Sequence, residues 1–213
     1  MLRIIFPIFG VILTNLVGCN LIRSYLLNRE NLIHEYNEIL FYTIIFNTIG
    51  WTIYGTVIKD IFIFISGITT IISSFGFIQI MYKYIKPEKL IYIEIISILF
   101  YLYFIIIIGL INFSDINIKK ILGVSCIIFT ILMNFMPILI IKQVINTQNT
   151  DLIYLPQAII NFINYSCWFI YGLLNYNLVL LITNSVSLSL CLFQIIVYGY
   201  VKIKNRNESL LLV

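Results

Sequence analysis

Aromatic and amide side chains recur at one spacing in a chain that is otherwise strongly apolar. Residues 167–184 read CWFIYGLLNYNLVLLITN, and residues 50–60 read GWTIYGTVIKD. Trp51 and Trp168 are 117 residues apart, and the tyrosine and glycine of each Trp-x-x-Tyr-Gly motif repeat at the same interval. An indole suits the apolar C–H face of a sugar ring, and the amide of Asn184 can donate to and accept from hydroxyls. These residue types indicate a pocket for a small polar molecule.

A simpler interpretation exists for each residue. Tryptophan near a membrane surface often serves only as an interfacial anchor, but two copies at equal depth favour a lined cavity. We therefore take Trp51 and Trp168 as candidate substrate contacts. Tyr54 and Tyr171, one turn further along, are candidate gating residues. The hydroxyl residues around Asn184 are interpreted as packing residues, since small side chains commonly fill helix contacts in membranes.

Composition indicates a membrane protein. Of the 213 residues, 61% are hydrophobic and only 10% are charged, whereas soluble domains carry about 25% charged residues. Mean hydropathy is +1.03. A helix needs roughly 20 mostly apolar residues to cross a bilayer. The apolar segments of about that length are 4–22, 39–58, 61–82, 90–113, 121–141, 152–174 and 178–201. This pattern predicts an all-α membrane protein with seven transmembrane helices.

The repeat predicts a 3+1+3 organisation. Residues 1–89 would form a first three-helix repeat, residues 90–120 a linker helix, and residues 121–201 a second three-helix repeat, with 202–213 as a short cytoplasmic tail. One inserted helix leaves the two bundles parallel. Transporters are commonly built from such repeats, with the substrate near the bilayer midplane.

Charge placement predicts the orientation. The net charge is +4, but Lys and Arg lie at segment ends, which argues for membrane topology and against a nucleic-acid partner. Nine of them fall on one side of the seven-span layout and four on the other. By the positive-inside rule the N-terminus is extracytoplasmic and the C-terminus cytoplasmic.

The chain shows no sign of an enzyme, a cofactor site or a metal site. Its four cysteines lie in apolar segments without paired spacing and are interpreted as core residues. His34 sits in a polar link and is interpreted as a solvated loop residue. Glu94 lies inside an apolar run, where reaching the interface is the simpler role and proton coupling the alternative.

Two prolines are candidate gating residues. Pro137 and Pro156 fall within or beside apolar segments, and proline removes a backbone donor and loosens a helix. A hinge and a plain packing kink or helix start both remain open.

The second half of the chain resembles the SWEET sugar transporters of the PQ-loop superfamily. The matching residues are CWFIYGLL at 167–174, TN at 183–184 and LFQIIVY at 192–198, with Pro137 and the Pro156-Gln157 pair extending the match. The resemblance implies two three-helix bundles joined by a linker. It also implies facilitated movement of mono- or disaccharides, without ion coupling, by alternating access. Trp51, Trp168 and Asn184 would contact the sugar.

The first repeat departs from the family pattern. The asparagine implied for its third helix is missing, and Thr69 or Gly67 stands in its place, depending on the alignment; Thr69 keeps a hydrogen-bonding group and is preferred. Asn20 and Leu40 occupy about the places of two family prolines. These changes leave the fold intact but affect gating or rate.

The expected function is facilitative, bidirectional sugar transport in the plasma membrane, with glucose as the type substrate. Two tryptophans facing one pocket narrow it and favour monosaccharides over disaccharides. The alternatives are a proton-coupled PQ-loop carrier of amino acids or other metabolites, a seven-helix receptor, and a membrane scaffold without transport. The lipid bilayer is the expected surrounding, and formation of a homo-oligomer is left open.

Overall fold

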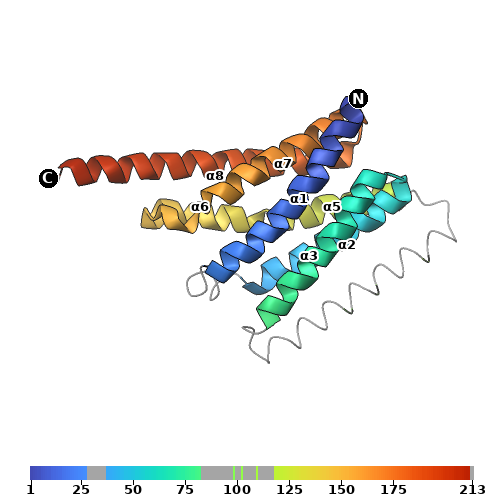
Figure 1. The fold of residues 1–213 in the computed structure, drawn as a ribbon, viewed down its shortest axis with the longest axis horizontal. Coiled ribbons are helices and arrows are strands. Elements are labelled where there is room, and N and C mark those ends of the chain that lie inside the picture. The colour runs from blue at the N-terminus through green and yellow to red at the C-terminus, as the bar shows by residue number, and fades with distance from the viewer. Residues whose placement is uncertain (28–36, 83–97, 99–101, 103–108, 110–117, 212–213) are drawn as a thin grey trace. The chain divides into compact units, whose positions relative to one another are not determined.

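The computed structural model describes residues 1–27, 37–82, 98, 102, 109 and 118–211, and the secondary structure of this part is helical (Figure 1). Its elements are α1 (Leu2–Leu27), α2 (Asn37–Ile58), α3 (Ile61–Tyr82), α5 (Ile118–Met133), α6 (Phe135–Thr147), the 3-10 turn η1 (Thr150–Leu152), α7 (Leu155–Leu174) and α8 (Leu178–Leu211). The all-helical class is confirmed. His34, Glu94 and most of the expected linker helix 90–120 lie outside the described residues.

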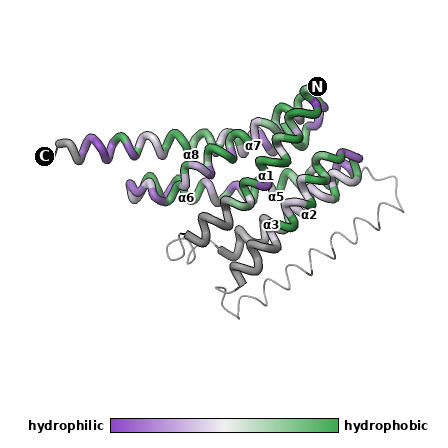
Figure 2. The backbone as a smooth tube through the Cα atoms, viewed as in Figure 1, coloured by the Kyte–Doolittle hydropathy of each residue, from purple (hydrophilic) through white to green (hydrophobic). Residues whose placement is uncertain are grey.

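Several described helices can cross a membrane by length and composition. The qualifying spans are Leu2–Cys19, Ile118–Thr147 and Leu178–Glu208, and Ile61–Ser74 is a shorter apolar stretch. Large apolar side chains on these helices are exposed, among them Ile72 (67%) and Leu178 (69%). Figure 2 shows hydrophobic colouring along much of these helices. Such surface is costly in water and favourable in lipid, which agrees with an integral membrane protein.

The chain forms two compact units, each with helices from both halves of the sequence. One unit contains Met1–Ser24 and Asn134–Val213, and the other contains Tyr25–Met133. In the first, α7 packs on α8 and α6 packs on α8; in the second, α2 packs on α3 and on α5. The chain passes between the units twice, from Ser24 to Tyr25 and from Met133 to Asn134. The repeat boundaries expected from sequence are based on the repeated motifs and not on which helices pack together. They stay a prediction.

The α2–α3 and α7–α8 hairpins turn in the same way. Lys59 and Tyr176, 117 residues apart, both adopt a left-handed backbone, with φ of 61° and 53°. The next residue in each hairpin donates its backbone N–H to the motif glycine carbonyl, at 2.9 Å from Asp60 to Gly55 and 2.9 Å from Asn177 to Gly172. The sequence repeat is therefore also a repeat of backbone conformation.

A side-chain oxygen begins the second helix of each hairpin. Asp60 Oδ1 accepts from the backbone N–H groups of Phe62 and Ile63, at 3.0 and 3.2 Å. Asn177 Oδ1 accepts from the backbone N–H of Leu180 at 3.2 Å. Both side chains satisfy donors that the first helical turn leaves without partners.

The motif glycines allow the two helices of each hairpin to approach closely. A Cβ added to Gly55 would lie 2.7 Å from the backbone nitrogen of Phe64. A Cβ added to Gly172 would lie 3.0 Å from Leu180 Cβ and 3.3 Å from the backbone nitrogen of Leu181. The glycine of Trp-x-x-Tyr-Gly therefore serves hairpin packing.

The expected fifth segment is two helices rather than one. The sequence predicts one segment over 121–141 that Pro137 interrupts near its end, and in the structure α5 ends at Met133 and α6 begins at Phe135. Pro137 accounts for the break, because its ring crowds the carbonyl four residues earlier, at Met133, and it has no N–H to donate there.

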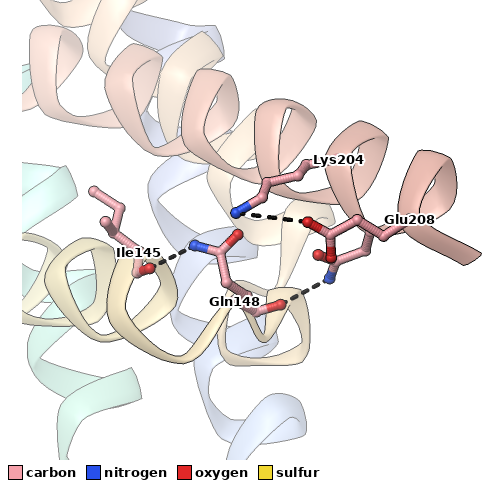
Figure 3. A network of polar contacts seen from close by, with 5 residues as sticks. Ile145, Gln148, Lys204 and Glu208 are labelled. Atoms are coloured by element: carbon pink, nitrogen blue, oxygen red, sulfur yellow. Dashed lines mark hydrogen bonds and ion pairs between the residues drawn. The ribbon is translucent and has the colours of Figure 1, made fainter.

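The last helix is longer than the expected 178–201, because α8 continues to Leu211. Its extension contacts the end of α6, where Gln148 ends that helix in a left-handed conformation. Asn205 Nδ2 donates to the Gln148 carbonyl at 2.8 Å, and Gln148 Nε2 donates to the Ile145 carbonyl (Figure 3). Beside this contact lies an apolar cluster of Ile141, Val144, Ile153, Val197 and Val201. The C-terminal end of α6 is thus fixed to α8.

Candidate functional site

Each repeated tryptophan packs edge-on against the tyrosine of its motif. The ring centroids of Trp51 and Tyr54 are 5.8 Å apart at 86°, and those of Trp168 and Tyr171 are 5.9 Å apart at 75°. Both tyrosines are 5% exposed. Edge-to-face geometry is favourable for aromatic pairs. The two halves therefore hold their candidate substrate and gating residues in the same local arrangement.

The indole of Trp168 is bound to α1. Its Nε1 donates to Thr14 Oγ1 at 3.2 Å, and the Thr14 hydroxyl donates to Asn164 Oδ1 at 3.2 Å. The ring also packs on Gly10, where an added Cβ would lie 2.8 Å from Trp168 Cε2. Asn164 is one turn before Trp168 on α7, so the three polar groups join α1 to α7.

The indole of Trp51 has a related set of partners on α2 and α5. Its Nε1 donates to Asn47 Oδ1 at 3.1 Å, and that oxygen also accepts from the Thr130 hydroxyl at 2.9 Å. Asn47 Nδ2 approaches Met133 Sδ at 3.7 Å. Here the tryptophan is held by its own helix, and the threonine arrives from the neighbouring helix.

Four partner residues were missed by sequence reasoning: Thr14, Asn47, Thr130 and Asn164. A signal was present, because Asn47 and Asn164 are 117 residues apart and one turn before their tryptophans. Each indole has a single N–H donor, and both donors are taken by the protein. Trp51 and Trp168 can therefore contact a ligand only through their rings.

Asn184 lies on α8 and is 7% exposed. Its Nδ2 donates to the Leu180 carbonyl at 2.8 Å and lies 3.4 Å from Thr183 Oγ1. Within the described part of the chain, its Oδ1 receives no hydrogen bond, which leaves this oxygen available to a hydroxyl donor. The structure thus orients the amide through its nitrogen.

Thr69 and Gly67 differ in what their positions tolerate. Thr69 is half-buried on α3, and its hydroxyl donates to the carbonyls of Ile65 and Ser66, both at 3.0 Å. Gly67 lies against Thr52 of α2, where an added Cβ would meet the Thr52 hydroxyl and lie 2.8 Å from its Cα. Gly67 is required for close packing, so Thr69 is the polar candidate in this helix.

The two candidate prolines occupy different kinds of position. Pro137 follows the break between α5 and α6, whereas Pro156 is the second residue of α7 and is exposed. The second position of a helix tolerates proline because its N–H has no helical partner. Neither position, by itself, assigns a gating role.

The four cysteines are free thiols, and the described residues hold no group of three or more His, Cys, Asp or Glu side chains that could bind a metal ion.

Comparison with known proteins shows similarity to one family. The model for the sugar efflux transporters for intercellular exchange matches residues 120–206. The bidirectional sugar transporter SWEET7 of Arabidopsis thaliana is 26% identical over 179 residues, covering 80% of this chain and 69% of the relative. These matches are to the SWEET family, to which the chain is similar. SWEET7b of Oryza sativa subsp. japonica is 30% identical over 79 residues, but the match covers 37% of this chain and 30% of the relative. The chain thus spans less than a third of the rice relative that it matches.

A solved eukaryotic SWEET transporter shows the same fold. It superposes with a TM-score of 0.77, covering 95% of this chain and 99% of that chain, at 15% sequence identity. The SWEET family is a family of transporters rather than a class of enzymes. The match to the family model includes Trp168 and Asn184, but it begins after Trp51 and Thr69 in the chain.

Proposed function

We propose that this chain is a facilitative, bidirectional sugar transporter that works by alternating access without ion coupling. The observation that carries the proposal is the family match over 120–206, which includes both Trp168 and Asn184. Monosaccharides such as glucose are the proposed substrates, and the lipid bilayer is the proposed surrounding.

Four residues are the proposed substrate contacts: Trp51, Thr69, Trp168 and Asn184. The engaged indole N–H groups support ring-face contact with the C–H face of a sugar. The Asn184 carboxamide supports hydrogen bonding to a hydroxyl, since its nitrogen is already held by α8. This division of roles between apolar ring and polar amide is typical of small-molecule sites.

Tyr54, Tyr171, Pro137 and Pro156 are the proposed gating residues. The helix break three residues before Pro137 supports a hinge there, because broken helices are places where backbone can bend. The two tyrosines pack on the substrate-contacting tryptophans, so a ring shift at either tyrosine would reach the sugar.

We further propose seven transmembrane helices in the 3+1+3 arrangement, with parallel repeats at 1–89 and 121–201. The common turn geometry of the α2–α3 and α7–α8 hairpins supports this repeat. The proposed topology has the N-terminus extracytoplasmic and the C-terminus cytoplasmic, and the charge asymmetry of the segment ends supports this orientation. The proposed location is the plasma membrane.

The decisive experiment is flux of labelled sugars in liposomes that contain the purified full chain. Glucose should equilibrate in both directions at rates independent of a pH gradient, and sucrose should move more slowly. Empty liposomes are the control. Flux that requires a proton gradient would favour the proton-coupled carrier, and the absence of flux for a sugar panel would overturn the transport proposal.

A further inference from the structure

A chain of buried polar contacts joins the helix break to the turn that carries Asn184. Asn134 Nδ2 donates to Ser187 Oγ at 2.9 Å, and the Ser187 hydroxyl donates to the Thr183 carbonyl at 3.0 Å. Asn184 Nδ2 lies 3.4 Å from Thr183 Oγ1. All of these residues lie within one compact unit.

The contact between Asn134 and Ser187 is buried, so loss of either partner destabilises the other. Asn134 is 4% exposed and Ser187 is 1% exposed. A buried amide that loses its partner costs more free energy than the hydrogen bond contributed, because water cannot replace that partner. The side chain of Asn134 makes no cap contact with its own helix α6. Its hydrogen bond therefore connects α6 to α8.

The position of this bond along α6 matters as much as its burial. The far end of α6 is already fixed to α8 by the hydrogen bond from Asn205 to Gln148 (Figure 3) and by the apolar cluster. Asn134 fixes the near end, directly before α6 begins and where the chain passes from one compact unit to the other. Ser187 is three residues after Asn184, so both lie on one face of α8.

We propose that Asn134 and Ser187 are a positioning pair: their hydrogen bond sets the α8 turn that presents Asn184 and fixes the start of α6 against it. This inference rests on the proposed sugar transport, in which Asn184 contacts the substrate. Neither residue touches the sugar. Their contribution reaches it through the Thr183 backbone and the orientation of the Asn184 amide.

The test compares Ser187→Ala with Ser189→Ala in full-length protein reconstituted in liposomes. Both serines donate to a backbone carbonyl four residues earlier, but Ser189 is exposed and, among the described residues, makes no hydrogen bond to another helix. Ser187→Ala should raise the KM for glucose about three-fold to ten-fold, the range expected for one buried hydrogen bond, with a smaller change in maximal rate. Ser189→Ala should leave both unchanged.

A double variant separates positioning from folding. Asn134→Leu with Ser187→Ala removes both partners and leaves no buried donor without an acceptor, so its thermal stability should approach that of wild type. Its KM should stay raised, because the link to the Asn184 turn is gone. A KM restored to the wild-type value would overturn the positioning role. If Ser187→Ala cannot be purified, this variant alone decides the question.

Hydrogen exchange provides a readout that does not depend on transport. Backbone amides at 134–141 should exchange about three-fold faster in Ser187→Ala than in Ser189→Ala. Equal exchange and equal KM in the two variants would overturn the positioning pair while wild-type glucose flux upholds the transport proposal. Absent wild-type flux would instead defeat the proposed function, and the exchange comparison would still decide whether the pair fixes α6.

Discussion

The two helix hairpins share a scaffold but differ at the position that carries the asparagine. The tight turns, the motif glycines and the Trp–Tyr pairs match between α2–α3 and α7–α8. Asn184 on α8 corresponds by the 117-residue interval to Gly67 on α3, which contacts Thr52 too closely for any side chain. In the first hairpin, this position therefore serves close helix packing and carries no amide side chain. Symmetry of backbone does not require symmetry of ligand contacts.

The hairpins also hold their tryptophans differently. Trp51 donates to Asn47 on its own helix, whereas Trp168 donates to Thr14 on a different helix. The bond within one helix does not depend on the position of a neighbouring helix, whereas the bond between helices depends on the position of α1. The position of Trp168 therefore depends on the packing of α1 against α7 more directly than the position of Trp51 depends on a neighbouring helix.

The largest expected effect concerns the substrate contacts. Trp168→Ala and Asn184→Ala should each reduce glucose uptake about ten-fold or more, because a ring face or a hydroxyl partner is lost. Thr69→Ala should cause a smaller loss, since its hydroxyl already donates to its own helix. Uptake of labelled glucose in transporter-deficient cells, compared at equal surface levels, measures all three. Unchanged uptake in both Trp168→Ala and Asn184→Ala would refute the site assignment.

Restoring the asparagine in the first repeat should succeed at one position and fail at the other. Gly67→Asn places a Cβ against the Thr52 backbone and should lower stability by about 1–3 kcal/mol, seen as a lower melting temperature in detergent. Thr69→Asn should fold normally, because its site already accepts a side chain. Equal melting temperatures for the two variants would show that Gly67 is not a packing requirement.

The two threonines should differ when their hydroxyls are removed. Thr14→Val leaves the indole N–H of Trp168 without its acceptor and should cost about 1–3 kcal/mol. Thr130→Val leaves the bond from Trp51 to Asn47 intact and should cost about 1 kcal/mol or less. Thermal unfolding measures both, and the emission of Trp168 should shift only in Thr14→Val. A larger loss for Thr130→Val would reverse the proposed difference between the halves.

The smallest expected effect is at the end of α8. Lys204 Nζ and Glu208 Oε1 are 3.9 Å apart and form an exposed ion pair. Glu208→Gln removes this pair and should change the free energy of unfolding by about 0.5 kcal/mol or less. Asn205→Ala removes a bond to the end of α6 and should have the larger effect of the two. Melting temperatures at low and high salt separate them, since only the ion pair is screened. A large change in Glu208→Gln would contradict the surface assignment.

Sequence reasoning went furthest where local patterns determine structure. Apolar runs predict most helices to within a few residues, and the 117-residue interval predicts both hairpins. The apolar runs at 152–174 and 178–201 also predict the helices that carry Trp168 and Asn184, which are α7 and α8. Their roles as substrate contacts stay predictions, as do the repeat boundaries and the linker helix.

By itself, the sequence determined an all-helical membrane protein with a repeated aromatic hairpin and an asparagine in one copy, because composition and spacing are properties of the chain. Tertiary structure decided which groups meet across helices. Gly67 proved to be a packing residue, the indole donors proved to be taken by Asn47 and Thr14, and Asn134 proved to bind Ser187. These contacts join residues up to 154 positions apart. Their geometry depends on helix packing, which local sequence patterns do not encode. The Trp168–Asn184 stretch is therefore recognisable from sequence, but its supports are visible only in the fold.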